Sequence, residues 1–237
     1  MRRAPGEALA KHGCGGLGTR DSGLGRRDQP CGSVLDYRHL IVGRIQGDSL
    51  IPDRCDPRFA ILFEPVDIGP VRSRNRFYQV PHCNGMGHAR PATLAAMRGV
   101  KAEGGWGVVC TEEVEISPYS EIAPHLEGRN WDEHDIPALA RMVDACHEHG
   151  ALAGIELMFN GYATPNRYSR EIPMAPSPLP VRMLDQIQAR QMSKRDIANV
   201  RRWHRQAALR ARAAGFDLIY VYAGHDLGLP LHFLSRL

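Results

Sequence analysis

Two reactive side chains, an imidazole and a thiol, are adjacent after a short apolar run early in the chain. Phe77–Val80 is rich in aromatic and β-branched residues, which predicts a strand. Pro81 ends this run, because proline cannot donate to a central ladder. His82 and Cys83 follow in a glycine-rich loop, and a thiolate is a nucleophile, so we expect His82 to help lower the pKa of the Cys83 thiol. The alternative is that Cys83 is a small, buried apolar side chain.

Carboxylates and a Tyr–His pair lie at the ends of three further apolar runs, which we predict as strands at Val108–Thr111, Leu152–Leu157 and Asp217–Tyr222. The side chains at their carboxyl ends are, in that order, Glu112 and Glu113, then Glu156, then Tyr222 and His225. A carboxylate is costly to bury unless it is paired, and histidine exchanges protons near pH 7. Residues of these types at strand ends can also be purely structural, and Glu113 can be a solvated glutamate.

Segments with helical spacing separate the four strands, and we predict helices at Thr93–Glu103, Pro137–Glu148 and Ser193–Ala214. Thr93 is a predicted N-cap, and Ser193 with Asp196 makes a capping pattern. A short hairpin is predicted from Val66–Pro70 with Val71. The alternation of strands and helices indicates a parallel sheet with right-handed crossovers. Because the carboxyl ends of parallel strands meet at one rim, we expect the reactive side chains to share a site.

Several ordered blocks of the sequence resemble the old yellow enzyme family of NADH:flavin oxidoreductases, and most closely its trimethylamine/dimethylamine dehydrogenase branch. The blocks are Phe63–Pro70, Arg74–Cys83, Lys101–Trp106, Cys110–Glu112, Ala153–Leu157 and Tyr220–His225. The resemblance implies an FMN-binding TIM barrel rather than a doubly wound sheet. A closed barrel of this type needs eight strands. We therefore expect an α/β fold that is a partial TIM (β/α)8 barrel, about the first four βα units, over residues 56–237.

The resemblance also implies roles for individual residues. Tyr222 and His225 match the active-site tyrosine and histidine over the flavin. Cys83 matches the cysteine that joins the flavin ring covalently in the amine dehydrogenases. The residues expected to bind the cofactor are Pro81, His82, Cys83, Glu112 and Glu156. Glu156 is expected to face the pyrimidine edge of the flavin.

Glu113 departs from the family pattern and is the expected substrate-binding residue. The trimethylamine enzymes have an aromatic residue at this position and the dimethylamine enzymes a polar one. A carboxylate suits a protonated amine that can donate a hydrogen bond. The resemblance therefore implies an FMN-dependent oxidoreductase that removes methyl groups oxidatively from a small amine by hydride transfer to FMN. Two alternatives stay open: an inactive partial barrel that needs a partner, and an ene-reductase or dienoyl-CoA reductase that uses NAD(P)H.

Composition narrows the class of protein. Apolar residues make up 43% of the 237 residues, and no apolar run approaches the roughly 20 residues of a membrane span. The net charge of +4 is too small, and too concentrated before residue 55, to indicate a nucleic-acid surface. The six cysteines form no CxxC pair, so neither a metal site nor the iron–sulfur site of the full-length amine dehydrogenases is readable. Scattered cysteines are typical of reduced thiols in a cytoplasmic protein.

The first 55 residues are rich in glycine and arginine and show no periodicity, which predicts a disordered extension. Four strands are half of a barrel, so we expect a truncated chain whose site is completed by a second fragment. The sequence leaves the oligomeric state, including a homo-oligomer, and the electron acceptor open.

Overall fold

The computed structural model describes residues 56–183, 185, 187–225 and 228–236. The predicted disordered extension, residues 1–55, lies outside this part of the chain, as do Cys14, Cys31 and Cys55. Within the described ranges, no helix combines the length and the apolar character needed to cross a membrane.

Four parallel strands form the central sheet. Their order is β3 (Tyr78–Gln79), β4 (Val108–Glu115), β6 (Leu152–Met158) and β9 (Leu218–Val221). The short strand β5 (Gly128–Arg129) pairs with the carboxyl end of β4. Neighbours in the sheet follow one another in chain order among these four strands, as expected for consecutive βα units. The predicted α/β alternation and parallel sheet are confirmed.

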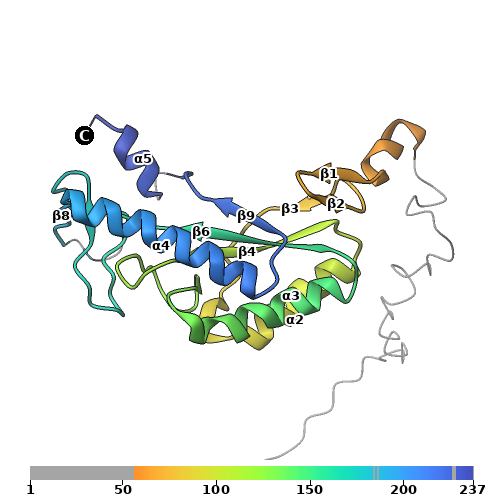
Figure 1. The fold of residues 1–237 in the computed structure, drawn as a ribbon, viewed down its shortest axis with the longest axis horizontal. Helices are drawn as coiled ribbons and strands as arrows, with labels where there is room; N and C mark the ends of the chain where they lie inside the picture. Colours follow the sequence, from red (N-terminus) through yellow and green to blue (C-terminus); the bar gives the residue numbers. More distant parts are fainter. Residues whose placement is uncertain (1–55, 184, 186, 226–227, 237) are drawn as a thin grey trace, which may run out of the picture. The chain divides into compact units, whose positions relative to one another are not determined.

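Three helices connect these strands: α2 (Pro91–Glu103), α3 (Ile136–His147) and α4 (Lys194–Ala213). α4 begins with the predicted capping box, in which Ser193 and Asp196 satisfy each other's backbone N–H groups. The predicted N-cap Thr93 is wrong, because α2 begins two residues earlier at Pro91, whose fixed φ suits the first turn. Figure 1 shows α2 and α3 on the same side of the sheet.

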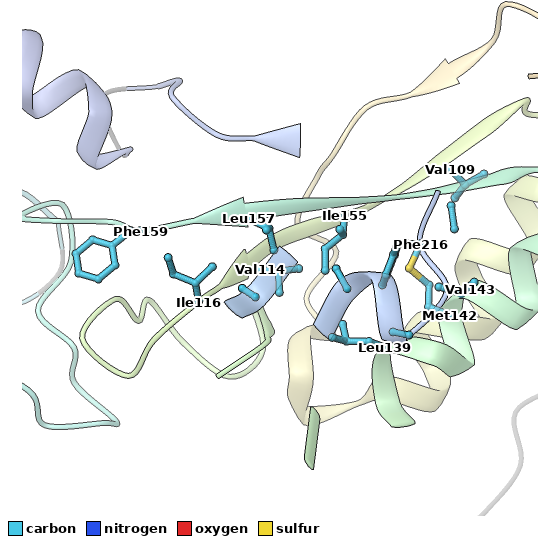
Figure 2. Packing of buried hydrophobic residues seen from close by; sticks show 14 of the residues in the cluster. Val109, Val114, Ile116, Leu139, Met142, Val143, Ile155, Leu157, Phe159 and Phe216 are labelled. Carbon is cyan, nitrogen blue, oxygen red and sulfur yellow. The ribbon is translucent and has the colours of Figure 1, made fainter. Parts of the chain in front are cut away.

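The main core lies between the sheet and the helices. Figure 2 shows side chains of β4 and β6 packed toward those of α3, with Phe216 between them and Phe159 farther along the sheet beside Ile116. The strand residues of this core include Val109, Val114, Ile155 and Leu157. Because side chains alternate along a strand, Glu156 lies on the sheet face that points away from the helices.

Strand β4 is longer than predicted and contains an irregularity. Its register with β6 shifts between Cys110 and Glu113, so an extra residue is accommodated there. Glu112 consequently points toward the helix side, where it meets Arg98 of α2. Glu113 pairs in register with Glu156 and shares its face. The two glutamates predicted together at the strand end therefore lie on opposite faces.

The remaining elements lie at the ends of the sheet and along its rim. β1 (Val66–Ile68) and β2 (Val71–Ser73) form the predicted antiparallel hairpin. β7 (Met174–Ala175) and β8 (Arg190–Gln191) pair in parallel within the connection between β6 and α4. The other short elements are the 3-10 turns η1 (Pro57–Phe63), η2 (Gly87–Ala89) and η3 (Glu133–Asp135), and the helix α5 (Leu229–Leu234).

Candidate functional site

The thiol of Cys83 is exposed in the loop that follows β3. A hydrogen bond from the backbone N–H of His82 to the carbonyl of Thr111, 3.3 Å long, ties this loop to β4. Desolvation, followed by the negative charges of Glu113 and Glu112, raises the pKa of the Cys83 thiol to about 11. The expected lowering of this pKa is therefore wrong, because the loop desolvates the thiol and places it near carboxylates.

The imidazole of His82 cannot supply the missing positive charge. Its Nδ1 lies 2.9 Å from the amide nitrogen of Gln79 and 3.2 Å from Nη1 of Arg98, and its Nε2 lies 3.2 Å from Nζ of Lys101. Desolvation and the charges of Arg98 and Lys101 lower the pKa of His82. The ring is therefore neutral near pH 7 and turned toward α2 rather than toward the thiol.

Glu113 and Glu156 lie side by side on neighbouring strands. Desolvation raises the pKa of Glu113 to about 7, against a smaller opposing effect of His225. Desolvation and the charge of Glu113 raise the pKa of Glu156 to about 8. Two carboxyls on adjacent strands repel each other when both are ionised, so the pair retains a proton near neutral pH.

Tyr222 and His225 are joined by a hydrogen bond between the phenol oxygen and Nδ1 of the imidazole. The two rings stack at 28°, with centroids 5.9 Å apart. His225 has a φ of 54°, in the left-handed region that non-glycine residues rarely adopt. Desolvation and the charges of Glu113 and Glu156 raise the pKa of Tyr222, so the phenol keeps its proton and can donate a hydrogen bond to Nδ1 of His225.

Five of the predicted residues therefore converge: Cys83, Glu113, Glu156, Tyr222 and His225. Glu113 acts electrostatically on Cys83, Glu156 and Tyr222, and His225 acts on Glu113. These residues come from the ends of all four strands and lie on or above the helix-free face of the sheet. The face is open at β9, where Tyr220, in register with Glu156, is 46% exposed.

The other predicted residues are placed differently. Pro81 is half-buried at the end of β3. Glu112 is fully buried and pairs through Oε2 with Nη2 of Arg98, 3.3 Å away. Arg98 was not singled out from the sequence, although an arginine on the apolar face of a predicted helix is a signal for a buried charged contact.

The convergent groups suit a flavin ring. Its pyrimidine edge carries an N–H that needs an acceptor, and Glu156 offers one from the open face. The Cys83 thiol is exposed beside the same face. The described residues contain no group of three metal-ligating side chains.

Comparisons with known proteins agree with this chemistry. The sequence model described as the NADH:flavin oxidoreductase / NADH oxidase family matches residues 61–237. Dimethylamine dehydrogenase of Hyphomicrobium sp. (strain x) is 44% identical over 186 residues, which cover 76% of this chain and 25% of that protein.

Solved structures show the same relationship. Histamine dehydrogenase from Rhizobium sp. 4-9 has 55% identity and a TM-score of 0.74, over 77% of this chain and 28% of its own. The old yellow enzyme homologue from Zymomonas mobilis has 23% identity and a TM-score of 0.64, over 70% of this chain and 49% of its own, and shares the fold. The chain thus spans between a quarter and a half of the length of these relatives.

Proposed function

The chain belongs to the NADH:flavin oxidoreductase / NADH oxidase family, and from that premise we propose that it forms part of an FMN-dependent amine dehydrogenase. The reaction we propose is oxidative N-demethylation of a small methylated amine. The observation that carries this proposal is the convergence of a thiol, two carboxyls and a Tyr–His pair on one open face of the sheet. The similarity to dimethylamine dehydrogenase supports an amine as the substrate class.

Two residues are assigned to the cofactor. Glu156 would accept the hydrogen bond from the pyrimidine edge of FMN, and Cys83 would hold the ring covalently. When bound, FMN supplies the acceptor for a hydride from the substrate. A thiol with a pKa of about 11 is protonated at neutral pH, so the attachment would be slow and would happen once in the life of the protein.

Glu113 and the Tyr–His pair are assigned to the substrate. An ionised Glu113 would attract the ammonium group of an amine and accept its hydrogen bond. With a pKa of about 7, Glu113 can also take the proton that the amine must lose before a hydride can leave its carbon. The phenol of Tyr222, held by His225, would orient the amine from the opposite strand end.

An amine-oxidation assay tests this proposal. The purified protein is incubated with an artificial electron acceptor and with dimethylamine, histamine or NADPH as the reductant. We expect reduction of the acceptor with an amine, and a large loss of this activity in Glu113→Gln. Reduction with NADPH and an enone, with no response to any amine, would instead identify the reductase alternative.

A further inference from the structure

Arg98 is the largest fully buried side chain of the described residues, and it lies on α2 outside the site described above. A buried guanidinium is costly unless its donors are satisfied. Arg98 directs its two terminal nitrogens toward β3, the loop after β3, and β4. It therefore connects one helix to the chain segment that carries Cys83.

The shorter hydrogen bonds of Arg98 go to this segment. Nη2 donates to the backbone carbonyl of His82 over 2.8 Å, and Nη1 donates to the side-chain oxygen of Gln79 over 3.0 Å. Nη1 also lies 3.2 Å from Nδ1 of the His82 ring. Two of these contacts thus fix the main chain and the ring of His82, the residue directly before Cys83, and the third holds Gln79, whose amide nitrogen lies 2.9 Å from the same ring.

The ion pair with Glu112 is the longer contact, at 3.3 Å. Arg98 uses one nitrogen on Glu112, and the second carboxylate oxygen of Glu112 is buried without a hydrogen-bond partner among the described residues. An arginine placed only to neutralise Glu112 would form a bidentate pair with both oxygens. The geometry instead indicates that Glu112 orients the guanidinium, while the guanidinium holds the loop.

We propose that Arg98 is a positioning residue for covalent attachment of the flavin: by fixing the carbonyl and the ring of His82, it holds the Cys83 thiol at the carboxyl end of β3. The inference rests on the proposed function, because it takes Cys83 as the point of attachment. Attachment exchanges the S–H of Cys83 and a ring C–H for a C–S bond. Two protons and two electrons leave, and dioxygen or a second oxidised flavin accepts the electrons.

The experiment compares Arg98→Met with wild type and with Arg141→Met, a matched control at an exposed position of α3. Cys14, Cys31 and Cys55 are first replaced by serine. Two quantities are measured by mass spectrometry: the fraction of Cys83 that carries flavin, and the alkylation rate at pH 8 of Cys83 in molecules without covalent flavin.

We expect the rate of flavin attachment in Arg98→Met to fall at least about tenfold, because small displacements of a reacting group are costly. We expect alkylation of Cys83 to rise about tenfold. Desolvation is the largest cause of the raised pKa of about 11, so a loop released from the guanidinium would hydrate the thiol and lower its pKa toward the ordinary value of 9.0. This fall raises the thiolate fraction roughly 100-fold, and the lower intrinsic nucleophilicity of the thiolate cancels roughly tenfold of that gain. Arg98→Lys, which can reach one partner at a time, should give intermediate values.

Buried Cys110 and Cys146 report unfolding, because they should stay unreactive in a folded variant. If they react in Arg98→Met, that variant has lost its fold. The same two measurements are then made on the double variant Arg98→Met with Glu112→Leu, which leaves no unpaired charge in the core. Covalent occupancy and alkylation equal to those of Arg141→Met would overturn the positioning role. If the wild type carries no covalent flavin, the attachment part of the proposed function fails, and the alkylation rates alone decide the role of Arg98.

Discussion

The carboxyl of Glu156 should lower the free energy of unfolding as the pH rises, and replacing Glu156 by glutamine should remove this effect. Glu156 is 3% exposed, and desolvation together with the charge of Glu113 raises its pKa from 4.5 to about 8. The folded chain therefore keeps a proton on Glu156 over a pH range in which the unfolded chain has released it.

The sign follows from the protons bound in each state. Below about pH 4.5 both states carry the proton, and the carboxyl of Glu156 has no effect. As the pH rises from about 4.5 to about 8, ionisation stabilises only the unfolded chain, so the free energy of unfolding falls. The full shift corresponds to roughly 5 kcal/mol as an upper bound, of which roughly 3 kcal/mol develops between about pH 5 and pH 8.

Urea unfolding at these two pH values measures the effect. Cys83→Ala serves as the background, so that flavin can be removed from every sample. We expect the free energy of unfolding to fall by about 3 kcal/mol more in this background than in the same background with Glu156→Gln. Glu133→Gln, at an exposed position of η3, is the control and should behave like the background. Equal losses with and without Glu156→Gln would refute the burial argument for this carboxyl.

Three further predictions concern the substrate, a helix end and a tight turn. Glu113→Gln should weaken binding of a protonated secondary amine, because the amine loses a charged hydrogen-bond acceptor. Binding of a neutral ligand of the same shape should be unchanged, and flavin spectral titration measures both affinities. Equal weakening of both would remove the case for amine recognition. Ser193→Ala should lower the free energy of unfolding by about 1 kcal/mol, since the cap of α4 is lost, and an unchanged urea midpoint would contradict this. Gly87→Ala should cost roughly 3 kcal/mol in the same assay, because φ is +47° and a Cβ would overlap the carbonyl oxygen of Pro124. Gly85→Ala has a positive φ but open space around it, so it should cost about 1 kcal/mol, and equal costs at the two glycines would contradict the steric argument.

The helices and the order of strands could be predicted because their signals are local. Apolar spacing located α3 within one residue at each end, and the Ser193–Asp196 pair marked the start of α4. The N-terminus of α2 was missed because Thr93 is a good capping type, whereas Pro91 at the first helical position decided the boundary.

The sequence predicted which residues gather at the site better than it predicted their orientation and pKa values. Strand ends indicated that Cys83, Glu113 and Tyr222 share one rim, since that follows from parallel strands alone. Alternation along β4 puts Glu112 and Glu113 on opposite faces, but the bulge between Cys110 and Glu113 decides which of them faces the site, and no sequence pattern signals such an irregularity. The pKa of Cys83 was predicted in the wrong direction because it depends on desolvation in the folded chain and on carboxylates brought close by β4 and β6.

The most direct test of the account is the state of Cys83 in the protein purified from cells supplied with riboflavin. Acid precipitation removes any flavin held without a covalent bond. The precipitate is then digested with a protease, and the mass of the peptide that contains Cys83 is measured by mass spectrometry. We predict a peptide heavier by one FMN less two hydrogens, and colour that stays with the precipitate. In Cys83→Ala the flavin should pass into the supernatant. Unmodified Cys83, in a protein that otherwise binds FMN, would contradict the assignment of this thiol to the flavin.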